Sequence, residues 1–319
     1  MNFWQSFAPC GARMGDDMSR HEAFALDFLE PRRDPPQNGP VFTYSSPDQT
    51  WLRRTLIRIV ERVSGRAHFE RVYRNWQGLR RAPGETVFTS AIKALKAQSK
   101  VSPADLARIP AEGPLLVVAN HPFGIVDGLL IGHLIATKRA DVKLICHALL
   151  CQPPEAQDVL LPVDFGPGPE ARRISAETRR KAVDWLDQGH ALIIFPGGGV
   201  ATSVSPWRGP AADFVWHPFV ARLARRTGVR TLAMHVEGQN SRLFQLVSHF
   251  SYPLRVALIF HETRRVLKRV VRVKIAEPVD MATVGKGDVA AVLRERTFAM
   301  GSGKATAADV FEFPPHISF

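Results

Sequence analysis

The stretch LLVVANHPFGIVDGLLIG, residues 115–132, decides the fold of this chain. It starts with an uninterrupted apolar run, which is typical of a strand buried on both faces of a sheet. Pro122 keeps His121 out of the helical conformation, so a turn follows the strand. Asp127 comes six residues after His121, where an apolar helix begins. A strand that passes through a short turn into a helix indicates a parallel α/β sheet.

The same alternation of short apolar runs and helical stretches continues from Gly113 toward the C-terminus. The predicted strands are PLLVVA, VKLICHA, DVLLPV, ALIIF, TLAMHV and VVRVKI. The predicted helices between them are DGLLIGHLIA, SAETRRKAVDWLDQ and HPFVARLARR. In the second helix, Ser175 is the expected N-cap and Gly189 the expected C-terminal stop. The sequence therefore predicts an α/β fold, with a mostly parallel mixed sheet covered by helices and an N-terminal helical segment.

These patterns divide the chain into a largely disordered lead, an Arg-rich helical segment, an α/β domain and a C-terminal tail, at residues 1–48, 49–110, 111–300 and 301–319. The lead contains EPRRDPPQNGP and little periodicity, which is why we expect disorder there. Ser46 or Asp48 is the expected start of the first helix, because either side chain can cap it.

Positive charge is concentrated in the helical segment. The whole chain has a formal net charge of +12, and residues 51–81 hold nine Arg against Glu61 and Glu70, which gives +7 for that stretch. This excess indicates an anionic partner, such as a membrane surface, an acidic carrier protein or nucleic acid. No nucleic-acid-binding motif accompanies the charge, so we expect no nucleic acid partner.

An apolar set recurs at helical spacing in the same segment, opposite the arginines: Trp51, Leu52, Leu56, Ile59, Val60 and Val63. Two interpretations remain open. In the first, these side chains pack on the α/β domain and the arginines form a solvated face. In the second, they contact an anionic bilayer together with the arginines.

Cysteine usage and hydropathy limit the class of protein. The three cysteines, Cys10, Cys146 and Cys151, show no disulfide framework, which favours a reducing compartment. Cys146, His147 and Cys151 could be half of a zinc site, but no second Cys/His pair follows, so we expect no metal. The first residues lack the pattern of a secretory signal, and no window approaches 18 apolar residues. We therefore expect a soluble or peripheral protein.

Two turns at predicted strand ends carry groups suited to chemistry, residues 120–124 and residues 195–199. Ligands of parallel sheets bind outside the carboxyl ends of the strands. In the first turn, Asp127 could accept the Nδ1 proton of His121 and leave Nε2 free as a general base. In the second, three consecutive glycines let backbone N–H groups approach a ligand. The alternative is a structural histidine, a helix-capping aspartate and a glycine turn.

The ordered blocks resemble the glycerolipid (lysophospholipid) acyltransferase family. NHPFGIVDG resembles its His-x4-Asp signature with five intervening residues, and IIFPGGGVAT resembles its Phe-Pro-x-Gly block. This spacing, with LPVDF, HPFVARLARRTGV and HVEGQNSRLFQL, is similar to the bacterial branch often labelled hemolysin-related. The resemblance covers roughly residues 110–280. Gly197 and Val200 stand where the family often has a Glu and an Arg that contact phosphate, which departs from the pattern of a glycerol-phosphate acceptor.

The resemblance implies an acyltransferase that moves a fatty acyl chain from an acyl-ACP or acyl-CoA thioester to a hydroxyl of a lysolipid. The acceptor would be a lysophospholipid or an amino-acid-containing lysolipid. His121 would be the general base and Asp127 its orienting carboxylate, with no cofactor beyond the thioester co-substrate. The candidate substrate-binding residues are Asn120, Phe123, Gly124, Phe195, Pro196, Gly197, Gly198, Gly199, Asn240 and Ser241. We expect a cytoplasmic protein, peripheral on the inner face of the cytoplasmic membrane. The alternative function is a non-catalytic peripheral protein that uses the Arg-rich helices as its membrane anchor.

Overall fold

A computed structural model of the chain describes residues 43, 50–79, 81–164, 166, 168–283, 287–302 and 306–314. All of them lie in one structural unit, Phe42–Phe319. Apart from Thr43, the predicted disordered lead lies outside the described residues, and so does the predicted helix start at Ser46 or Asp48.

Helices occupy the Arg-rich segment, as the periodicity predicts. They are α2 (Trp51–Ser64), α3 (Arg66–Gln77), α4 (Val87–Leu95) and the short α5 (Pro103–Ala107). Gly65 separates α2 from α3, because its φ of 98° lies in the left-handed region that side chains rarely adopt. Thr86 caps α4 by accepting a hydrogen bond from the Thr89 N–H.

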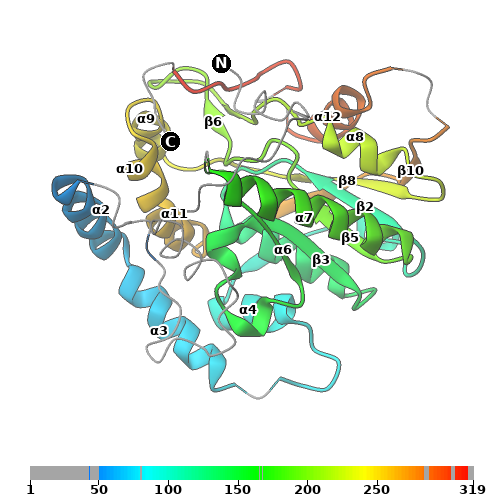
Figure 1. Cartoon of the computed structure of the whole chain (residues 1–319), viewed down its shortest axis with the longest axis horizontal. Coiled ribbons are helices and arrows are strands. Elements are labelled where there is room, and N and C mark those ends of the chain that lie inside the picture. Colours follow the sequence, from blue (N-terminus) through cyan, green and yellow to red (C-terminus); the bar gives the residue numbers. More distant parts are fainter. Residues whose placement is uncertain are drawn as a thin grey trace, which may run out of the picture. The chain divides into compact units, whose positions relative to one another are not determined.

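The sheet confirms the predicted fold class (Figure 1). In the described part of the chain it holds eight strands, in the order β1-β9-β8-β2-β5-β3-β4 with β10 paired to β8. Their bounds are β1 (Gln98–Lys100), β2 (Leu115–Ala119), β3 (Val142–His147), β4 (Leu160–Val163), β5 (Ala191–Ile194), β8 (Arg230–Val236), β9 (Val270–Ile275) and β10 (Val279–Asp280). Pairing is parallel except where β8 meets β9 and β10, so the sheet is mixed and mostly parallel. Strands β6 (Thr202–Ser203) and β7 (Ala211–Ala212) form a separate antiparallel pair.

Strand β2 lies at the centre of the sheet, between β5 and β8. All five of its side chains are fully buried, which explains why its sequence is apolar without alternation. Because β2, β5 and β8 run parallel, their carboxyl ends meet at one edge. This edge brings the turn that follows β2 and the glycine turn that follows β5 side by side.

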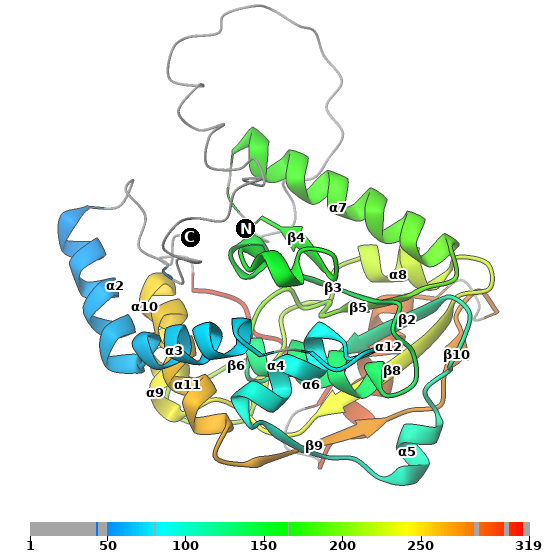
Figure 2. The ribbon, with the colours of Figure 1, turned by 90° about the horizontal axis from the view of Figure 1, so that it is seen from below.

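Helices cover both faces of the sheet, as Figure 2 shows. One apolar cluster packs α4 and α6 (Ile125–Ala136) against the first face. A second packs α7 (Pro169–Asp187), α8 (Phe219–Ala224) and α12 (Val289–Ala299) against the other. Both faces of the parallel strands are therefore removed from water.

The predicted N-cap of α7 is wrong. The helix begins at Pro169 after Gly168, and Ser175 lies inside it, 3% exposed. Pro is favoured at a first helical position because its fixed φ is helical and its missing N–H has no partner there anyway. Ser175 Oγ instead donates to the Asp164 carbonyl (2.9 Å) and accepts from the Asp164 N–H (3.2 Å). Gly189 follows the end of α7 with a φ of 88°, as expected of a helix stop.

Three further helices connect α2 to the edge with the two turns: α9 (Arg242–Ser248), α10 (Tyr252–Ala257) and α11 (Ile259–Val266). Their apolar cluster, centred on Phe244 and Ile259, includes Val60 of α2, Ile125 of α6 and Val200. Helix α2 thus lies beside α10 and α11, as both ribbon views show.

Most apolar side chains of α2 do not pack on the α/β domain. Five of them are 48–78% exposed: Trp51, Leu52, Leu56, Ile59 and Val63. Helix α2 faces the protein mainly with Ile57, Glu61 and Ser64, which are at most 3% exposed. The first interpretation, in which the apolar side chains of this helix pack on the α/β domain, is therefore wrong for these five residues. Among the described residues, no helix has the length and apolar character needed to cross a membrane.

Candidate active site

His121 lies in the turn that follows β2. Asn120 fixes the start of this turn, because its Nδ2 donates to the Val236 carbonyl (2.9 Å) and its Oδ1 accepts from the Val236 N–H (2.7 Å). On the other side, the Ala201 N–H donates to the His121 carbonyl (2.7 Å). The backbone of His121 is thus held between β8 and the loop after β5. Because Val236 occupies both ends of its amide, Asn120 has a structural role in the turn.

Asp127 faces His121 from the first turn of α6. Its carboxylate is fully buried, and Oδ2 lies 2.9 Å from His121 Nδ1. The same oxygen accepts hydrogen bonds from the N–H groups of Phe123 (2.8 Å) and Gly124 (2.9 Å). Gly124 has a φ of 96°, so only glycine fits this turn without strain. Asp127 therefore caps the helix and also faces the imidazole.

The contact between His121 and Asp127 is close but is not aligned as a hydrogen bond at Nδ1. The second carboxylate oxygen of Asp127, Oδ1, has no partner among the described residues. The 2.9 Å between His121 Nδ1 and Asp127 Oδ2 is still short enough for a hydrogen bond to form. Hydrogen bonds of a catalytic site are often poorly aligned before substrate binds and tighten in the complex. The pair has the spacing that a base and its orienting carboxylate need.

Phe195 sets the plane of the imidazole. Its ring stacks on the His121 ring, with centroids 4.1 Å apart and an interplanar angle of 24°. The His121 side chain is 17% exposed, so the ring is sheltered but reachable. With Nδ1 facing Asp127, Nε2 is the nitrogen left for a substrate proton.

The glycine turn after β5 offers fewer free donors than its sequence indicates. The Gly198 N–H donates to the Phe195 carbonyl (2.9 Å) and so closes the turn. The N–H groups of Gly197 and Gly199 make no hydrogen bond within the described residues. A side chain at residue 199 would meet the Phe214 ring at 2.7 Å, so glycine is required for this packing. The predicted oxyanion donors are therefore narrowed to Gly197 and Gly199.

The two remaining predicted residues, Asn240 and Ser241, lie in the loop after β8 and differ in their contacts. Ser241 caps α9 by accepting from the Phe244 N–H (3.2 Å), and its Oγ donates to Glu262 (2.5 Å). Asn240 is 3% exposed, and neither end of its side-chain amide has a partner among the described residues. A buried amide without a partner is unfavourable, so Asn240 is suited to a ligand and Ser241 is structural.

Asp213 is a carboxylate beside His121 that the motifs did not identify. It is fully buried; its Oδ1 accepts from the His121 N–H (3.2 Å) and its Oδ2 accepts from Trp216 Nε1 (3.1 Å). Burial raises the pKa of Asp213, while Trp216, the His121 N–H and Arg294 act in the opposite direction. It lies 92 residues from His121 in sequence and belongs to none of the motifs.

Arg255 is a second buried group that the sequence analysis missed. Its guanidinium donates to the Val200 carbonyl and to Thr202 Oγ1, next to the residue that holds the His121 carbonyl. Burial lowers the pKa of Arg255 to about 10, and no carboxylate in the described residues pairs with it. Three aromatic rings surround it, with centroids 4.9–5.8 Å from the guanidinium carbon: Phe214, Phe244 and Phe313.

A cavity of about 820 Å³ opens beside the His121 turn. Such a volume is typical of small-molecule sites. Asn120 and Pro122, on either side of His121, line it together with Asp213 and His235. His235 is 7% exposed, and its Nδ1 has no partner in the described residues. Burial lowers the pKa of His235 to about 4, so it lines the cavity as a neutral ring at neutral pH.

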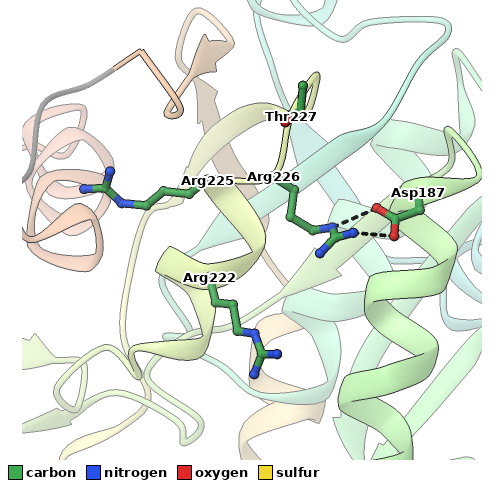
Figure 3. Close-up of a pocket in the computed structure, with 5 residues that line it drawn as sticks. All are labelled: Asp187, Arg222, Arg225, Arg226 and Thr227. Carbon is green, nitrogen blue, oxygen red and sulfur yellow. Dashed lines mark hydrogen bonds and ion pairs between the residues drawn. The ribbon is translucent and has the colours of Figure 1, made fainter.

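A smaller cavity of about 390 Å³ lies at the other end of the sheet (Figure 3). Its lining residues are Asp187, Arg222, Arg225, Arg226 and Thr227. Asp187 ends α7 before β5 and Thr227 precedes β8, so this cavity lies at the amino ends of those strands. Arg226 pairs with Asp187, and the three guanidinium groups point in different directions (Figure 3). It is remote from His121 and does not belong to the candidate active site.

Similarity to known proteins shows which family the chain belongs to. A family model described as acyltransferase matches residues 51–298, which is most of the chain. Among solved structures, the chain is similar to the 1-acyl-sn-glycerophosphate (LPA) acyltransferase PlsC from Thermotoga maritima, at 18% sequence identity and a TM-score of 0.42, over 77% of this chain and 93% of that chain. No curated protein matches the chain. Because the family model spans both turns and the strands that carry them, the chain belongs to the acyltransferase family.

Proposed function

We propose that this protein transfers a fatty acyl chain from an acyl-ACP or acyl-CoA thioester to a hydroxyl of a lysolipid. The observation that carries the proposal is the buried Asp127 carboxylate 2.9 Å from Nδ1 of His121, at the carboxyl end of the central strand. An imidazole oriented in this way is suited to take a proton from a hydroxyl group.

In the proposed reaction, His121 Nε2 takes the proton of the lysolipid hydroxyl as its oxygen attacks the thioester carbonyl carbon. Asp127 holds the imidazole in the tautomer with the proton on Nδ1 and stabilises the imidazolium that forms. The tetrahedral intermediate then breaks its carbon–sulfur bond. The proton on Nε2 passes to the leaving sulfur, so the products are an ester and a free thiol.

Groups around the pair supply the remaining roles. The N–H groups of Gly197 and Gly199 are the proposed donors to the oxyanion of the intermediate, because donors fixed in advance favour the transition state. The amide of Asn240 is the proposed partner of the acceptor head group, because it is buried without another partner in the described residues. Asn240 does not line the cavity beside Asn120 and Pro122, but its neighbour Gln239 does, so this cavity is the proposed place for the part of the acceptor beyond the group that Asn240 binds.

The exposed apolar side chains of α2 support attachment to an anionic membrane surface. They project beside the positive charges of Arg58 and Arg62, which are also exposed. Other exposed apolar side chains are Val204 and Trp207 in the loop after β6 and Phe250 after α9. Apolar side chains that enter a bilayer next to basic residues are typical of peripheral proteins. The proposed location is the inner face of the cytoplasmic membrane.

An acyl-transfer assay tests this function directly. The purified protein is incubated with acyl-ACP or acyl-CoA and a panel of lysophospholipids and amino-acid-containing lysolipids, and products are detected by mass spectrometry. The proposal expects a new ester for at least one donor and acceptor pair. Vesicle binding without an acyl product from any pair would favour the alternative, a non-catalytic membrane-binding protein.

A further inference from the structure

Asp213 holds the backbone of the residue that carries the proposed base. Its Oδ1 accepts the His121 N–H at 3.2 Å, and Trp216 Nε1 holds its Oδ2 at 3.1 Å. Both N–H groups point at a carboxylate that is fully buried, so its position is fixed from two sides. No other hydrogen bond of the His121 N–H occurs in the described residues.

The segment after α12 fixes Asp213 in turn. The Phe311 N–H and Arg294 Nη2 both donate to the Asp213 carbonyl, at 3.1 and 3.2 Å. Arg294 also donates to the carbonyls of Phe214 (2.7 Å) and Asp309 (2.5 Å). Phe311 is 2% exposed and meets the Phe214 ring edge-on, with centroids 5.2 Å apart. Residues 309–311, which lie beyond the family match at 51–298, therefore complete the support of the His121 turn.

We infer that Asp213 is a positioning residue for His121, acting through the backbone of the turn and through its charge. The inference rests on the proposed role of His121 as base. Two carboxylates face this histidine, Asp127 from α6 at the ring and Asp213 from the loop after β7 at the backbone. Arg294 of α12 is the basic group facing Asp213. The negative charge of Asp213 complements the positive charge that the ring gains when it takes the substrate proton.

Three variants separate the hydrogen bond from the charge. Asp213→Asn removes the charge and keeps an oxygen for only one of the two donors, because its NH2 must face either the His121 N–H or Trp216 Nε1. Combining Asp213→Asn with Trp216→Phe removes the competing donor, so the oxygen stays with the His121 N–H, whereas Asp213→Ala removes the hydrogen bond and the charge together. We expect kcat to fall in all three variants, because all of them lose the negative charge beside His121. In Asp213→Ala we expect kcat to fall by tenfold to a hundredfold, on the order expected of a misplaced catalytic group, with little change in KM. The exposed Asp280→Asn is the matched control.

NMR spectra of the histidine ring carbons test the same inference without turnover. We expect the His121 resonances to move in Asp213→Asn and to stay in place in Asp280→Asn. A wild-type protein without acyl transfer would count against the proposed function and leave these spectra valid. Unmoved His121 resonances together with an unchanged kcat in a folded Asp213→Asn would overturn the positioning role. If Asp213→Ala does not fold, Asp213→Asn still decides the question.

A separate observation concerns the two described cysteines. Sγ of Cys146, in β3, lies 3.6 Å from Sγ of Cys151, at the end of the short helix η1 (Ala148–Cys151). Both are partly exposed. A disulfide needs about 2.05 Å between the sulfurs, so a shift of the short helix brings the pair into bonding distance. The contact with Cys151, and then burial, raise the pKa of the Cys146 thiol.

We further propose that Cys146 and Cys151 are an oxidisable pair, with a peroxide as oxidant. The Cys151 thiolate attacks one peroxide oxygen, the O–O bond breaks, and a sulfenic acid and one water form. Cys146 then attacks the Cys151 sulfur, the S–S bond forms, and a second water leaves. Two thiols lose two hydrogens and two electrons, and the peroxide becomes two waters.

Alkylation after hydrogen peroxide treatment tests the pair. We expect the wild-type protein and Cys10→Ser to lose alkylation at both Cys146 and Cys151, and to regain it after dithiothreitol. Peptide mapping is expected to find the two residues linked within one chain. In Cys151→Ser this link cannot form, so Cys146 is expected to remain alkylated. Full alkylation of the treated wild type, or a link to Cys10 instead, would overturn the proposal.

Discussion

Asp127 links the start of α6 to His121, the proposed base, because one of its oxygens lies close to three groups. Oδ2 accepts from the N–H groups of Phe123 and Gly124 and lies 2.9 Å from Nδ1 of His121. A carboxylate held by two backbone donors cannot rotate freely. The imidazole is therefore oriented by a group that is itself part of the helix start.

Replacing Asp127 by Asn separates its two roles. The amide oxygen can still cap α6, but the negative charge that stabilises the imidazolium is lost. We expect kcat to fall more than tenfold, yet less than in His121→Ala, with a melting temperature within a few degrees of wild type. Steady-state kinetics and thermal unfolding measure the two effects. A fully active variant would mean that Asp127 only caps the helix.

Replacing Asn240 by Leu tests whether its buried amide serves a ligand. The variant removes two polar atoms that have no partner among the described residues, so the free energy of unfolding should stay equal or rise. The KM for the acceptor should rise by roughly twofold to tenfold, the range of one lost hydrogen bond. Ser241→Ala, which removes a structural cap, should show the reverse pattern. A destabilised Asn240→Leu with unchanged KM would make Asn240 structural.

Helices and strands with a strong local sequence pattern were predicted well. Those whose position depends on contacts with a segment distant in sequence were not. The buried strand β2 and helices α2 to α4 follow from apolar runs and periodicity. Strand β1 is only Gln98–Lys100, three polar residues, and forms because β9 offers an edge. The start of α7 was misplaced because Ser175 has the chemistry of a cap but is used inside the helix, where Asp164 bonds to it.

The exposed apolar side chains of helix α2 are expected to hold the protein on a membrane. Changing Leu52, Leu56 and Ile59 to Ser should release the protein from anionic vesicles and spare turnover of detergent-dispersed substrate, because these side chains are 48–62% exposed. Val270→Ser, on the equally exposed Val270 of β9, is the matched control. Each basic residue near an anionic leaflet adds up to roughly 1 kcal/mol, so binding should also weaken as salt rises.

Vesicle sedimentation at several salt concentrations measures both effects. Wild type should bind vesicles with anionic lipid and bind poorly to purely zwitterionic ones. Two outcomes would contradict a membrane role of α2. One is undiminished binding of the triple variant, and the other is equal binding of wild type to neutral vesicles.

At the scale of the whole molecule, the site is assembled from segments that are far apart in sequence. His121 and Asp127 could be predicted together because a strand, a turn and a helix bring them to one place within six residues. Asp213 could not, because its partner lies 92 residues away. Arg255 reaches Thr202 across 53 residues for the same reason. Local spacing therefore identifies the pair, and only the fold identifies what holds it.

The buried His235, which lines the cavity, is expected to make the free energy of unfolding depend on pH. Burial lowers its pKa from 6.5 to about 4, while the charge of Glu237 acts to raise it and the charge of Lys274 to lower it. Between these values the unfolded chain binds a proton that the folded chain does not, so the free energy of unfolding falls as pH falls from about 6.5 toward 4. The slope is at most roughly 1.4 kcal/mol per pH unit.

Urea unfolding of wild type and His235→Asn at pH 7.5, 6 and 5 isolates this contribution. The difference between the two proteins should shift in favour of His235→Asn as the pH falls, because Asn does not titrate. A difference that stays constant across the three pH values would show that His235 does not titrate with folding.

His121 is proposed to remove the proton from the acceptor hydroxyl during acyl transfer. Single-turnover acyl transfer by wild type, His121→Ala and the exposed-site control His68→Ala tests this role, with a donor and acceptor pair that the wild type uses. We expect His121→Ala to be slower by about 10²- to 10⁴-fold, His68→Ala to match wild type, and all three to unfold at similar temperatures. A folded His121→Ala within tenfold of the wild-type rate would rule out His121 as the base.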